Sequence, residues 1–338
     1  MVRDVLDTLI ERTVVPSFTS IGPALRRRLH DWPALESFDL SGRTVVLTGG
    51  TSGIGRAAAR LYATLGATLV IVARDPDRTA ATVGELQRDT GNAAISSVIA
   101  DLGDLDAVRR ASDELLGRHP RIDVLVHNAG ALFTRRKRST SGTDLSVELM
   151  VAAPFLMTGR LLPALANGER PARVLTMSSG GMYTEPLSVE GLEMPDRDYQ
   201  GAKQYARAKR AQVTLNELWA ARVPATRTVF QALHPGWVDT PGINDALPGF
   251  SKVLGPLGLL RSAREGADTL VWLSAAAAAL HDSGSFWHDR AIRSPHLTAA
   301  SRRADTVPRR EALWHWCERH TGYTFDPTVI GGGAAQER

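Results

Sequence analysis

The chain has 338 residues, of which 43% are hydrophobic and 22% are charged, and this composition excludes a disordered or fibrous protein. Its length suits one large α/β domain with extensions and leaves two small domains open. The net charge of +4 is spread along the sequence, so we expect no nucleic-acid partner. A single cysteine, Cys317, excludes an intramolecular disulfide and favours a reducing compartment. Because we find neither a signal-peptide pattern nor an apolar run near ~20 residues, we expect a cytoplasmic protein.

The first 40 residues precede the first strand candidate. Two segments in them, Val5–Val14 and Pro23–His30, are compatible with helix. We interpret residues 1–40 as a helical arm packed on the surface of the main domain. The run Arg26-Arg27-Arg28 follows an apolar patch, which leaves open a contact of residues 1–30 with a membrane surface. The apolar face is short, and this disfavours the membrane alternative.

From residue 43 onward, short β-branched runs alternate with longer alanine-rich patterns of helical period. This alternation predicts an α/β fold, a Rossmann-type doubly wound parallel sheet of about seven strands with helices on both faces. The predicted strands are Arg43–Thr48, Thr68–Ala73, Ile95–Ala100, Ile122–His127, Arg173–Met177, Arg227–Leu233 and Ser285–His288. The predicted helices are Ile54–Leu65, Asp77–Thr90, Leu105–Arg118, Thr143–Leu165, Ala202–Arg222 and Ala263–Ala279. Ligands of such sheets lie outside the carboxyl ends of the strands.

A glycine-rich loop follows the first predicted strand. Residues 48–55 read Thr-Gly-Gly-Thr-Ser-Gly-Ile-Gly, and an alanine-rich helical pattern comes next. The glycines let the backbone approach a pyrophosphate, which the free N–H groups at the helix start then bind. Similar loops also occur in turns that bind no phosphate, but the strand–turn–helix context favours a nucleotide cradle.

Four further motifs lie at strand ends or at the start of a helix. Asn128-Ala129-Gly130 follows the fourth strand and Ser178-Ser179 ends the fifth. Tyr205 and Lys209 open the next helix, and the run from His234 to Thr240 follows the sixth strand. With the glycine loop, these motifs make the chain resemble the short-chain dehydrogenase/reductase family over about residues 40–290. The resemblance implies a dinucleotide-binding domain at residues 41–290 and an extension at 291–338, whose tail, Gly331–Arg338, we expect to be disordered.

Longer runs narrow the resemblance within that family. The runs 176–182, 205–212 and 234–242 are similar to the branch called dehydrogenase/reductase member 12, as are Glu265–Thr269 and Phe286–Arg290. That branch also carries an arm before its glycine loop. The resemblance implies hydride transfer between a nicotinamide cofactor and a carbonyl or alcohol, and leaves the substrate open.

Three side chains are the predicted catalytic residues. A tyrosine with an ordinary pKa near ~10 is a poor base at neutral pH. Lys209 lies four residues after Tyr205 on the same helix face, and its charge lowers the pKa of the phenol. We therefore assign Tyr205 as acid/base, Lys209 as its electrostatic partner and Ser179 as the ligand of the reacting oxygen. Ser178 is the alternative for the last role.

Two alternatives concern the tyrosine. Tyr199 and Lys203 have the same spacing as Tyr205 and Lys209, but a polar run precedes Tyr199 and Gly201 lies between the two residues. We read that pair as a solvated helix entrance. Tyr205 itself is open to a second interpretation, as a buried tyrosine that only forms a structural hydrogen bond.

The cofactor type is read at the end of the second strand. NAD-binding relatives place an acidic residue there, whereas this chain has Ala73 and then Arg74, whose guanidinium suits a 2′-phosphate. Asp75 still leaves NAD(H) open, so we expect NADP(H) as the preferred cofactor, and no metal. Asp101 is predicted to contact adenine, or to lie at the start of the following helix as its carboxylate. The predicted cofactor-binding residues are Gly49, Thr51, Ser52, Gly53, Ile54, Gly55, Arg74, Asp101, Leu102, Asn128, Ala129, Gly130, Tyr205, Lys209, Pro235, Gly236, Val238 and Thr240.

One position departs from the family pattern. Most active members carry an asparagine in the helix after the Asn-Ala-Gly strand, where it holds a water in a proton relay. Our alignment places Met150 there, and a thioether is a weak hydrogen-bond acceptor. The chain is therefore either an enzyme with a rerouted relay or a nucleotide-binding scaffold or sensor with little or no activity.

The substrate side gives the weakest sequence signal. The segment between Ser179 and Tyr205 and the segment Pro241–Leu260 are expected to wall the pocket. Their apolar residues are Met182, Tyr183, Leu187, Leu192, Met194, Ile243, Leu247, Phe250 and Leu254. An apolar wall suits a lipophilic small molecule, although such residues also occur where a lid simply packs. A homo-oligomer is left open because many family members form one.

Overall fold

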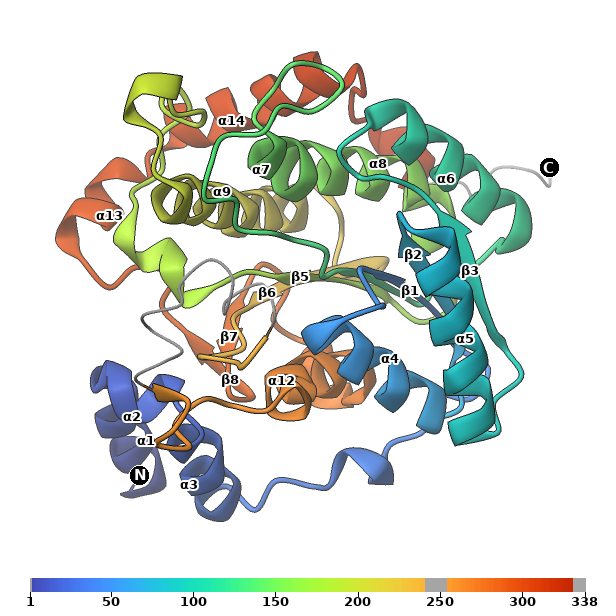
Figure 1. The fold of residues 1–338 in the computed structure, drawn as a ribbon, viewed down its shortest axis with the longest axis vertical. Coiled ribbons are helices and arrows are strands. Elements are labelled where there is room, and N and C mark those ends of the chain that lie inside the picture. Colours follow the sequence, from blue (N-terminus) through green and yellow to red (C-terminus); the bar gives the residue numbers. More distant parts are fainter. Residues whose placement is uncertain (1, 241–253, 331–338) are drawn as a thin grey trace.

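The computed structural model describes residues 2–240 and 254–330, and an eight-stranded sheet forms its centre (Figure 1). The strands lie in the order β3-β2-β1-β4-β5-β6-β7-β8. All neighbours from β3 to β7 pair in parallel, and β8 pairs antiparallel with β7. The strands are β1 (Thr44–Thr48), β2 (Thr68–Ala73), β3 (Ile95–Ile99), β4 (Val124–His127), β5 (Ala172–Met177), β6 (Thr228–Leu233), β7 (Phe286–His288) and β8 (Ala291–Arg293). The predicted doubly wound fold class is confirmed.

Helices cover both faces of the sheet, as Figure 1 shows. Apolar side chains of one face pack against α4 and α12, and those of the other face against α6, α8 and α9. The main helices are α4 (Gly53–Thr64), α5 (Pro76–Thr90), α6 (Leu105–Arg118), α7 (Leu145–Val147), α8 (Ala153–Leu165), α9 (Gly201–Arg222), α12 (Ala263–Ala275), α13 (Ala299–Ala304) and α14 (Val307–Thr321). The carboxyl ends of the parallel strands therefore share one edge, where the predicted motifs lie.

Strand β8 is the element that the sequence analysis missed. It follows β7 after a turn in which Asp289 and Arg290 adopt φ angles of 51° and 55°. Residues other than glycine seldom occupy this left-handed region, so the sequence carried no turn signal there. The buried contacts of Asp289, described below, hold the turn in place.

The predicted helix Thr143–Leu165 is interrupted. A π-helical turn, Glu148–Ala152, separates α7 from α8, and the N–H of Ala153 donates to the carbonyl of Glu148 five residues back. Pro154 follows, and a proline has no N–H with which to bond the carbonyl of Met150 four residues earlier. The interruption thus follows from the sequence position of Pro154, and π turns are frequent at functional sites.

The helical run Leu145–Leu165 also corrects our expectation about apolar stretches. Its 21 residues are long and apolar enough to cross a membrane by length and composition. Within that run, 78% of the most apolar window is buried inside the protein. It lies in the core beside the sheet, so we interpret it as a core helix.

Three helices form the N-terminal arm: α1 (Val2–Arg12), α2 (Val14–Phe18) and α3 (Ile21–Leu29). Figure 1 places the arm beside β7, β8 and α12. Its inner side is anchored by Arg26, which is fully buried and forms an ion pair of 2.6 Å with Asp289. Large apolar side chains remain exposed on its outer side: Leu6, Leu9, Val14, Val15, Ile21 and Leu25. The arm therefore packs on the domain, and it does so through charged as well as apolar groups.

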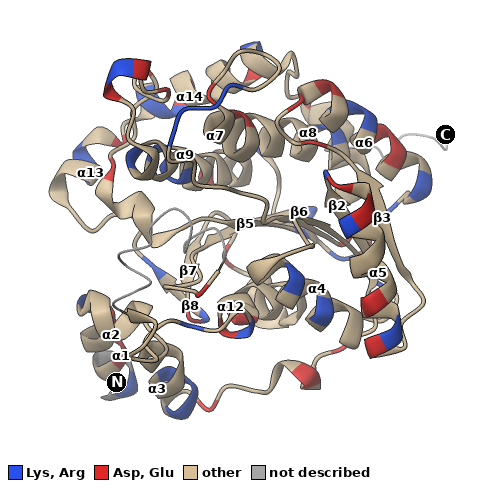
Figure 2. Cartoon of the chain, in the orientation of Figure 1, with Lys and Arg blue, Asp and Glu red and all other residues tan. Residues whose placement is uncertain are grey.

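Charged side chains of both signs lie along the outer helices, as Figure 2 shows for α5 and α6. The basic run at residues 135–138 is paired with acidic residues. Arg136 lies 2.8 Å from Asp196 and 2.9 Å from Glu193, and Arg138 lies 3.2 Å from Asp196. These pairs offset much of the positive charge of this loop.

Candidate active site

The glycine loop joins β1 to the start of α4. Gly49 and Gly53 have φ angles of 72° and 51°, which a side chain would strain. A Cβ atom at Gly55 would collide with the carbonyl oxygen of Gly49 and the side chain of Asn128. Thr51, Ser52 and Ile54 remain at least partly exposed beside these glycines. The start of α4 therefore presents its N–H groups in the tight geometry that a pyrophosphate needs.

Asn128 braces this loop from β4. Its side-chain amide donates to the carbonyl oxygens of Thr48 at 3.0 Å and Gly49 at 3.2 Å. The backbone N–H groups of Asn128 and Ala129 both donate to the Thr48 hydroxyl, at 3.0 and 3.1 Å. The structure thus places the Asn-Ala-Gly motif in a bracing position, where it fixes the loop at the junction of β1 and β4.

The loop after β6 lies against the glycine loop from the other side. A Cβ atom at Gly53 would lie 3.4 Å from the Thr240 methyl group. Val238 is buried, and a Cβ atom at Gly266 of α12 would lie 2.7 Å from Val238 and 3.2 Å from Ile54 of α4. Gly236 has a φ angle of 76°, and Pro235 precedes it. Thr240 and Val238 of this loop therefore lie near the cradle, whereas Pro235 and Gly236 lie against Arg261.

The adenosine side is more open. Arg74 is exposed at the end of β2, whereas the Asp75 carboxylate caps α5 by accepting from the N–H of Arg78 at 3.0 Å. Asp101 is exposed, and its carboxylate accepts from the N–H of Gly103 at 2.9 Å. The alternative that made Asp101 the carboxylate at the start of α6 is wrong, because Asp104 caps that helix. The buried Leu102 lies between them.

The three predicted catalytic residues converge at the ends of β5 and α9. Lys209 is 2% exposed, its ammonium donates to the Met177 carbonyl at 2.7 Å, and it lies 5.4 Å from the centre of the Tyr205 ring. Burial lowers the pKa of Lys209 to about 7. Burial also raises the pKa of Tyr205 to about 12, and a hydrogen bond with Ser179 partly offsets this rise. The three side chains are thus neighbours, but the prediction that Lys209 lowers the pKa of Tyr205 is not met, because burial of the phenol dominates.

The structure separates the two serines and the two tyrosines. The Ser178 hydroxyl is buried and donates to the Lys209 carbonyl at 3.1 Å, whereas Ser179 contacts Tyr205. Tyr199 lies before the first residue of α9, so it does not share a helix face with Lys203. Its hydroxyl instead donates to the carbonyl of Phe133 at 3.4 Å. Ser179 and Tyr205 are therefore better placed for chemistry than Ser178 and Tyr199.

Met150 lies where the sequence alignment predicts it, beside the catalytic lysine. A Cβ atom at Gly130 would lie 3.2 Å from the Met150 sulfur and 3.3 Å from the Lys209 nitrogen. Met150 is fully buried in the π-helical turn. The side chain brings no strong acceptor to Lys209, but its own carbonyl lacks the α-helical donor that Pro154 removes.

The predicted wall of the substrate pocket is only partly described. Met182, Tyr183, Leu187, Leu192 and Met194 are all buried, and Met182 and Tyr183 pack with Phe18 and Phe286. These five side chains fit the alternative of lid packing. Leu254 is half-buried, and Ile243, Leu247 and Phe250 lie outside the described residues.

Sequence reasoning missed two residues that touch the predicted site. Arg261 donates to the carbonyl of Pro235 at 3.1 Å, and Phe18 packs against Gly180, next to Ser179. A single arginine in a loop and a single phenylalanine in a short helix carry no local signal. Only the folded chain brings them there.

A cluster of Glu11, His234 and His288 holds three possible ligand atoms within 4.8 Å of one another. Both ring nitrogens of His288 are already bonded, Nδ1 to Glu11 at 3.2 Å and Nε2 to Arg261 at 3.1 Å. Arg26 donates to the Glu11 carboxylate as well, at 2.6 Å. Because two guanidinium groups occupy the cluster, we assign it to hydrogen bonding and not to a metal.

Comparisons with known proteins support these observations. A short chain dehydrogenase family model matches residues 43–248. Human dehydrogenase/reductase SDR family member 12 is 37% identical over 273 residues, which cover 80% of this chain and 84% of that protein. DnrU of Streptomyces sp. (strain C5), whose name describes a daunorubicin C-13 ketoreductase, is 36% identical over 254 residues, covering 75% of this chain and 85% of its own.

Solved structures agree with the fold. An uncharacterized protein from Mycobacterium paratuberculosis superposes with a TM-score of 0.68 at 25% identity, covering 87% of this chain and 99% of that one. The NADP active-site complex of RhlG from Pseudomonas aeruginosa gives a TM-score of 0.60 at 25% identity, covering 74% of this chain and 95% of that one. The chain therefore belongs to the short-chain dehydrogenase/reductase family of oxidoreductases and is similar to its member 12 branch.

Proposed function

We propose that this protein is an NADP(H)-dependent oxidoreductase that interconverts a carbonyl and an alcohol on a lipophilic small molecule. The observation that carries the proposal is the convergence of Ser179, Tyr205 and Lys209 beside the glycine loop. A bound nicotinamide cofactor would supply or accept the hydride at the carbon atom of the substrate. The protein side chains then handle the proton on the oxygen atom.

In the direction of reduction, the Tyr205 hydroxyl gives its proton to the oxygen of the carbonyl as hydride reaches the carbon. The raised pKa keeps the phenol protonated at neutral pH, which suits a proton donor. The Lys209 ammonium, held by the Met177 carbonyl, stabilises the phenolate that remains. Ser179 donates to the same oxygen and fixes its position. Oxidation of an alcohol follows these steps in reverse.

Two observations support the finer assignments. The position at the end of β2 where NAD-binding relatives carry an acidic residue is Ala73 in this chain, and the exposed Arg74 follows it. The neighbouring Asp75 carboxylate already caps helix α5. The related DnrU is named as a daunorubicin C-13 ketoreductase, and a ketone substrate agrees with the proposed carbonyl chemistry. The residues that would hold the cofactor are the eighteen predicted from the sequence.

A matched pair of tyrosine variants tests the proposal. Tyr205→Phe removes only the phenolic oxygen and is expected to slow NADPH oxidation with hydrophobic ketones by on the order of a hundredfold to ten-thousandfold. NADPH affinity is expected to change little. Tyr199→Phe, the same substitution at the other tyrosine, is the control and should retain wild-type turnover. Full activity in Tyr205→Phe would contradict the assignment.

Met150 favours a second candidate function, a nucleotide-binding scaffold without turnover, because a thioether adjoins Lys209 where active relatives carry an amide. The backbone of Met150 opposes this candidate, since Pro154 supplies no α-helical N–H to its carbonyl and a backbone oxygen can hold a relay water with any side chain. The scaffold predicts NADPH binding by the wild-type protein and no ketone-dependent NADPH oxidation. Product formation from any ketone excludes it.

A further inference from the structure

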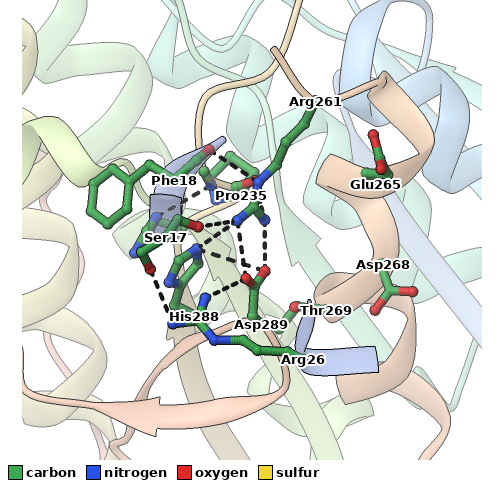
Figure 3. A network of polar contacts seen from close by, with 12 residues as sticks. Ser17, Phe18, Arg26, Pro235, Arg261, Glu265, Asp268, Thr269, His288 and Asp289 are labelled. Atoms are coloured by element: carbon green, nitrogen blue, oxygen red, sulfur yellow. Dashed lines mark hydrogen bonds and ion pairs between the residues drawn. The ribbon is translucent and has the colours of Figure 1, made fainter. Parts of the chain in front are cut away.

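Residues 17–20 of the N-terminal arm bond the loop after β6 and the segment at residues 259–261, and Figure 3 shows Ser17 and Phe18 beside Arg261 and Pro235. The N–H of Trp237, in the loop after β6, donates to the Phe18 carbonyl at 2.7 Å. The N–H of Ser20 donates to the Leu259 carbonyl at 3.0 Å. The backbone of the arm thus bonds directly to the loop after β6, which carries the predicted cofactor-binding residues from Pro235 to Thr240.

Arg261 fastens these pieces together and is 1% exposed. Its guanidinium donates to the arm, at the carbonyls of Ser17 (2.6 Å), Phe18 (3.1 Å) and Thr19 (3.1 Å). It also donates to the Pro235 carbonyl at 3.1 Å. Its backbone accepts from Asp239 and donates to Trp237, at 2.9 and 2.8 Å. One side chain therefore holds the arm and the loop after β6 in a fixed relation.

Buried ion pairs fix the orientation of the arm on the domain. Asp289 accepts from Arg261 at 2.6 and 3.0 Å and from Arg26 of the arm at 2.6 Å, as Figure 3 shows. Arg26 also pairs with Asp7 at 2.7 Å and with Glu11 at 2.6 Å. Charge-assisted bonds between buried groups are directional, and an alternative docking of the arm would leave several of them unpaired.

The Phe18 ring connects the arm to the catalytic serine. It is 5% exposed, and its centre lies 4.6 Å from that of His234 and 5.8 Å from that of Trp237. A Cβ atom at Gly180 would lie 2.5 Å from the ring, so only glycine fits next to Ser179. Phe18 therefore fills the space between the turn that carries Ser179 and the loop after β6.

We infer that the N-terminal arm is part of the active site and that Phe18 and Arg261 are positioning residues for the reacting end of the cofactor pocket. This inference rests on the proposed function. Phe18 packs next to Ser179 and Arg261 bonds the Pro235 carbonyl, and under the proposed function the nicotinamide must lie at the Ser179 end of the pocket for hydride transfer. The adenosine side, at Arg74 and Asp101, belongs to β2 and β3. Loss of the Phe18 ring should therefore weaken the binding of the nicotinamide half of the cofactor more than that of the adenosine half.

The test compares two probes in Phe18→Ala. NADPH reaches both halves of the pocket, whereas adenosine 2′,5′-bisphosphate reaches only the adenosine half. We expect the dissociation constant of NADPH to rise at least tenfold and turnover to fall further, while that of the bisphosphate stays within twofold. Leu25→Ala, on the exposed outer side of the arm, is the control and should match the wild type.

Phe18→Leu keeps apolar volume and should recover part of the NADPH affinity, and it is the variant to use if Phe18→Ala does not fold. Equal weakening of both probes in Phe18→Leu would overturn the inference, because it would show a general loss of structure. Unchanged NADPH binding and turnover in either variant would overturn it as well. Failure of the proposed function is distinguishable, because the wild-type protein itself would then bind no NADPH or reduce no ketone.

Discussion

The two ends of the chain differ in the kind of contact that dominates their attachment to the same domain. The N-terminal arm is held by buried charges, above all Arg26 and Asp289. The C-terminal helix α14 is held by aromatic packing, in which the Trp314 ring lies 4.9 Å from Phe155 and 4.7 Å from Trp219. Buried charges require one arrangement of donors and acceptors, whereas aromatic rings tolerate several geometries. The attachment of the arm should therefore tolerate fewer substitutions than the attachment of α14.

Both attachments reach the candidate active site. The arm contacts the turn next to Ser179 through Phe18. The last turn of α14 contacts the π-helical turn of Met150, because His320 lies 2.6 Å from the buried carboxylate of Glu148. Segments outside the sheet thus brace two elements of the candidate active site, and we expect them to differ in their tolerance of substitution.

The largest effect is expected from Asp289→Asn. This change keeps the shape of the side chain but leaves Arg26 and Arg261 without their shared carboxylate. Removing one partner of a buried ion pair lowers the free energy of unfolding by about 3–5 kcal/mol. Urea denaturation measures the loss. Asp113→Asn, at an exposed ion pair with Arg160, is the control and should change the same quantity by less than about 1 kcal/mol.

A smaller effect is expected from Trp314→Phe at the other end. The phenyl ring keeps an aromatic contact with Phe155 and Trp219, so the loss in the free energy of unfolding should stay below about 2 kcal/mol. The same urea titration compares it with Asp289→Asn. A larger loss for Trp314→Phe than for Asp289→Asn would reverse the proposed difference between the two attachments.

The third prediction concerns pH. Burial lowers the pKa values of His234 and His288, which lie under the arm, below the ordinary value of 6.5. The unfolded chain therefore binds more protons than the folded one just below pH 6.5, and stability falls as the pH falls through this window. The pKa of Asp289 is also held low, although burial opposes this, by His288, Arg261 and Arg26. Its contribution is present above its ordinary value of 3.8 and is lost at lower pH.

Hydrogen exchange at pH 7, 6 and 5, corrected for the intrinsic rate, measures this effect at both ends. Residues 17–20 should lose protection as the pH falls, whereas residues 311–317 of α14 should lose little. Equal loss at both ends would contradict the pH prediction, because it would show that the buried histidines do not act on the arm.

The sheet and the cofactor cradle were predictable because their signals are local. Strand β2 and helix α6 have the predicted bounds, and the glycine loop precedes α4 as its spacing indicated. The β7–β8 turn was not predicted, because it contains no glycine and two consecutive residues other than glycine, Asp289 and Arg290, seldom both adopt left-handed backbone. The interruption at Glu148–Ala152 was missed as well, although Pro154 was its visible cause.

In the candidate site, too, contacts between residues close in the sequence were predictable and contacts between distant residues were not. Tyr205 and Lys209 share a helix, so their spacing in the sequence sufficed to bring them together. The contact of Arg26 with Asp289 joins residues 263 positions apart, and no pattern in a single sequence indicates such a pair. The apolar residues from Met182 to Met194 were ambiguous in the sequence because packing and substrate binding require the same side chains.

The most direct test of the central claim is the affinity of the purified protein for NADPH and for NADH, measured by tryptophan fluorescence with wild type and Arg74→Ala. We predict that the wild type binds NADPH at least tenfold more tightly than NADH. Arg74→Ala should weaken NADPH binding and leave NADH binding unchanged, since only NADPH carries the 2′-phosphate. Binding of neither cofactor, or tighter binding of NADH, would contradict the account.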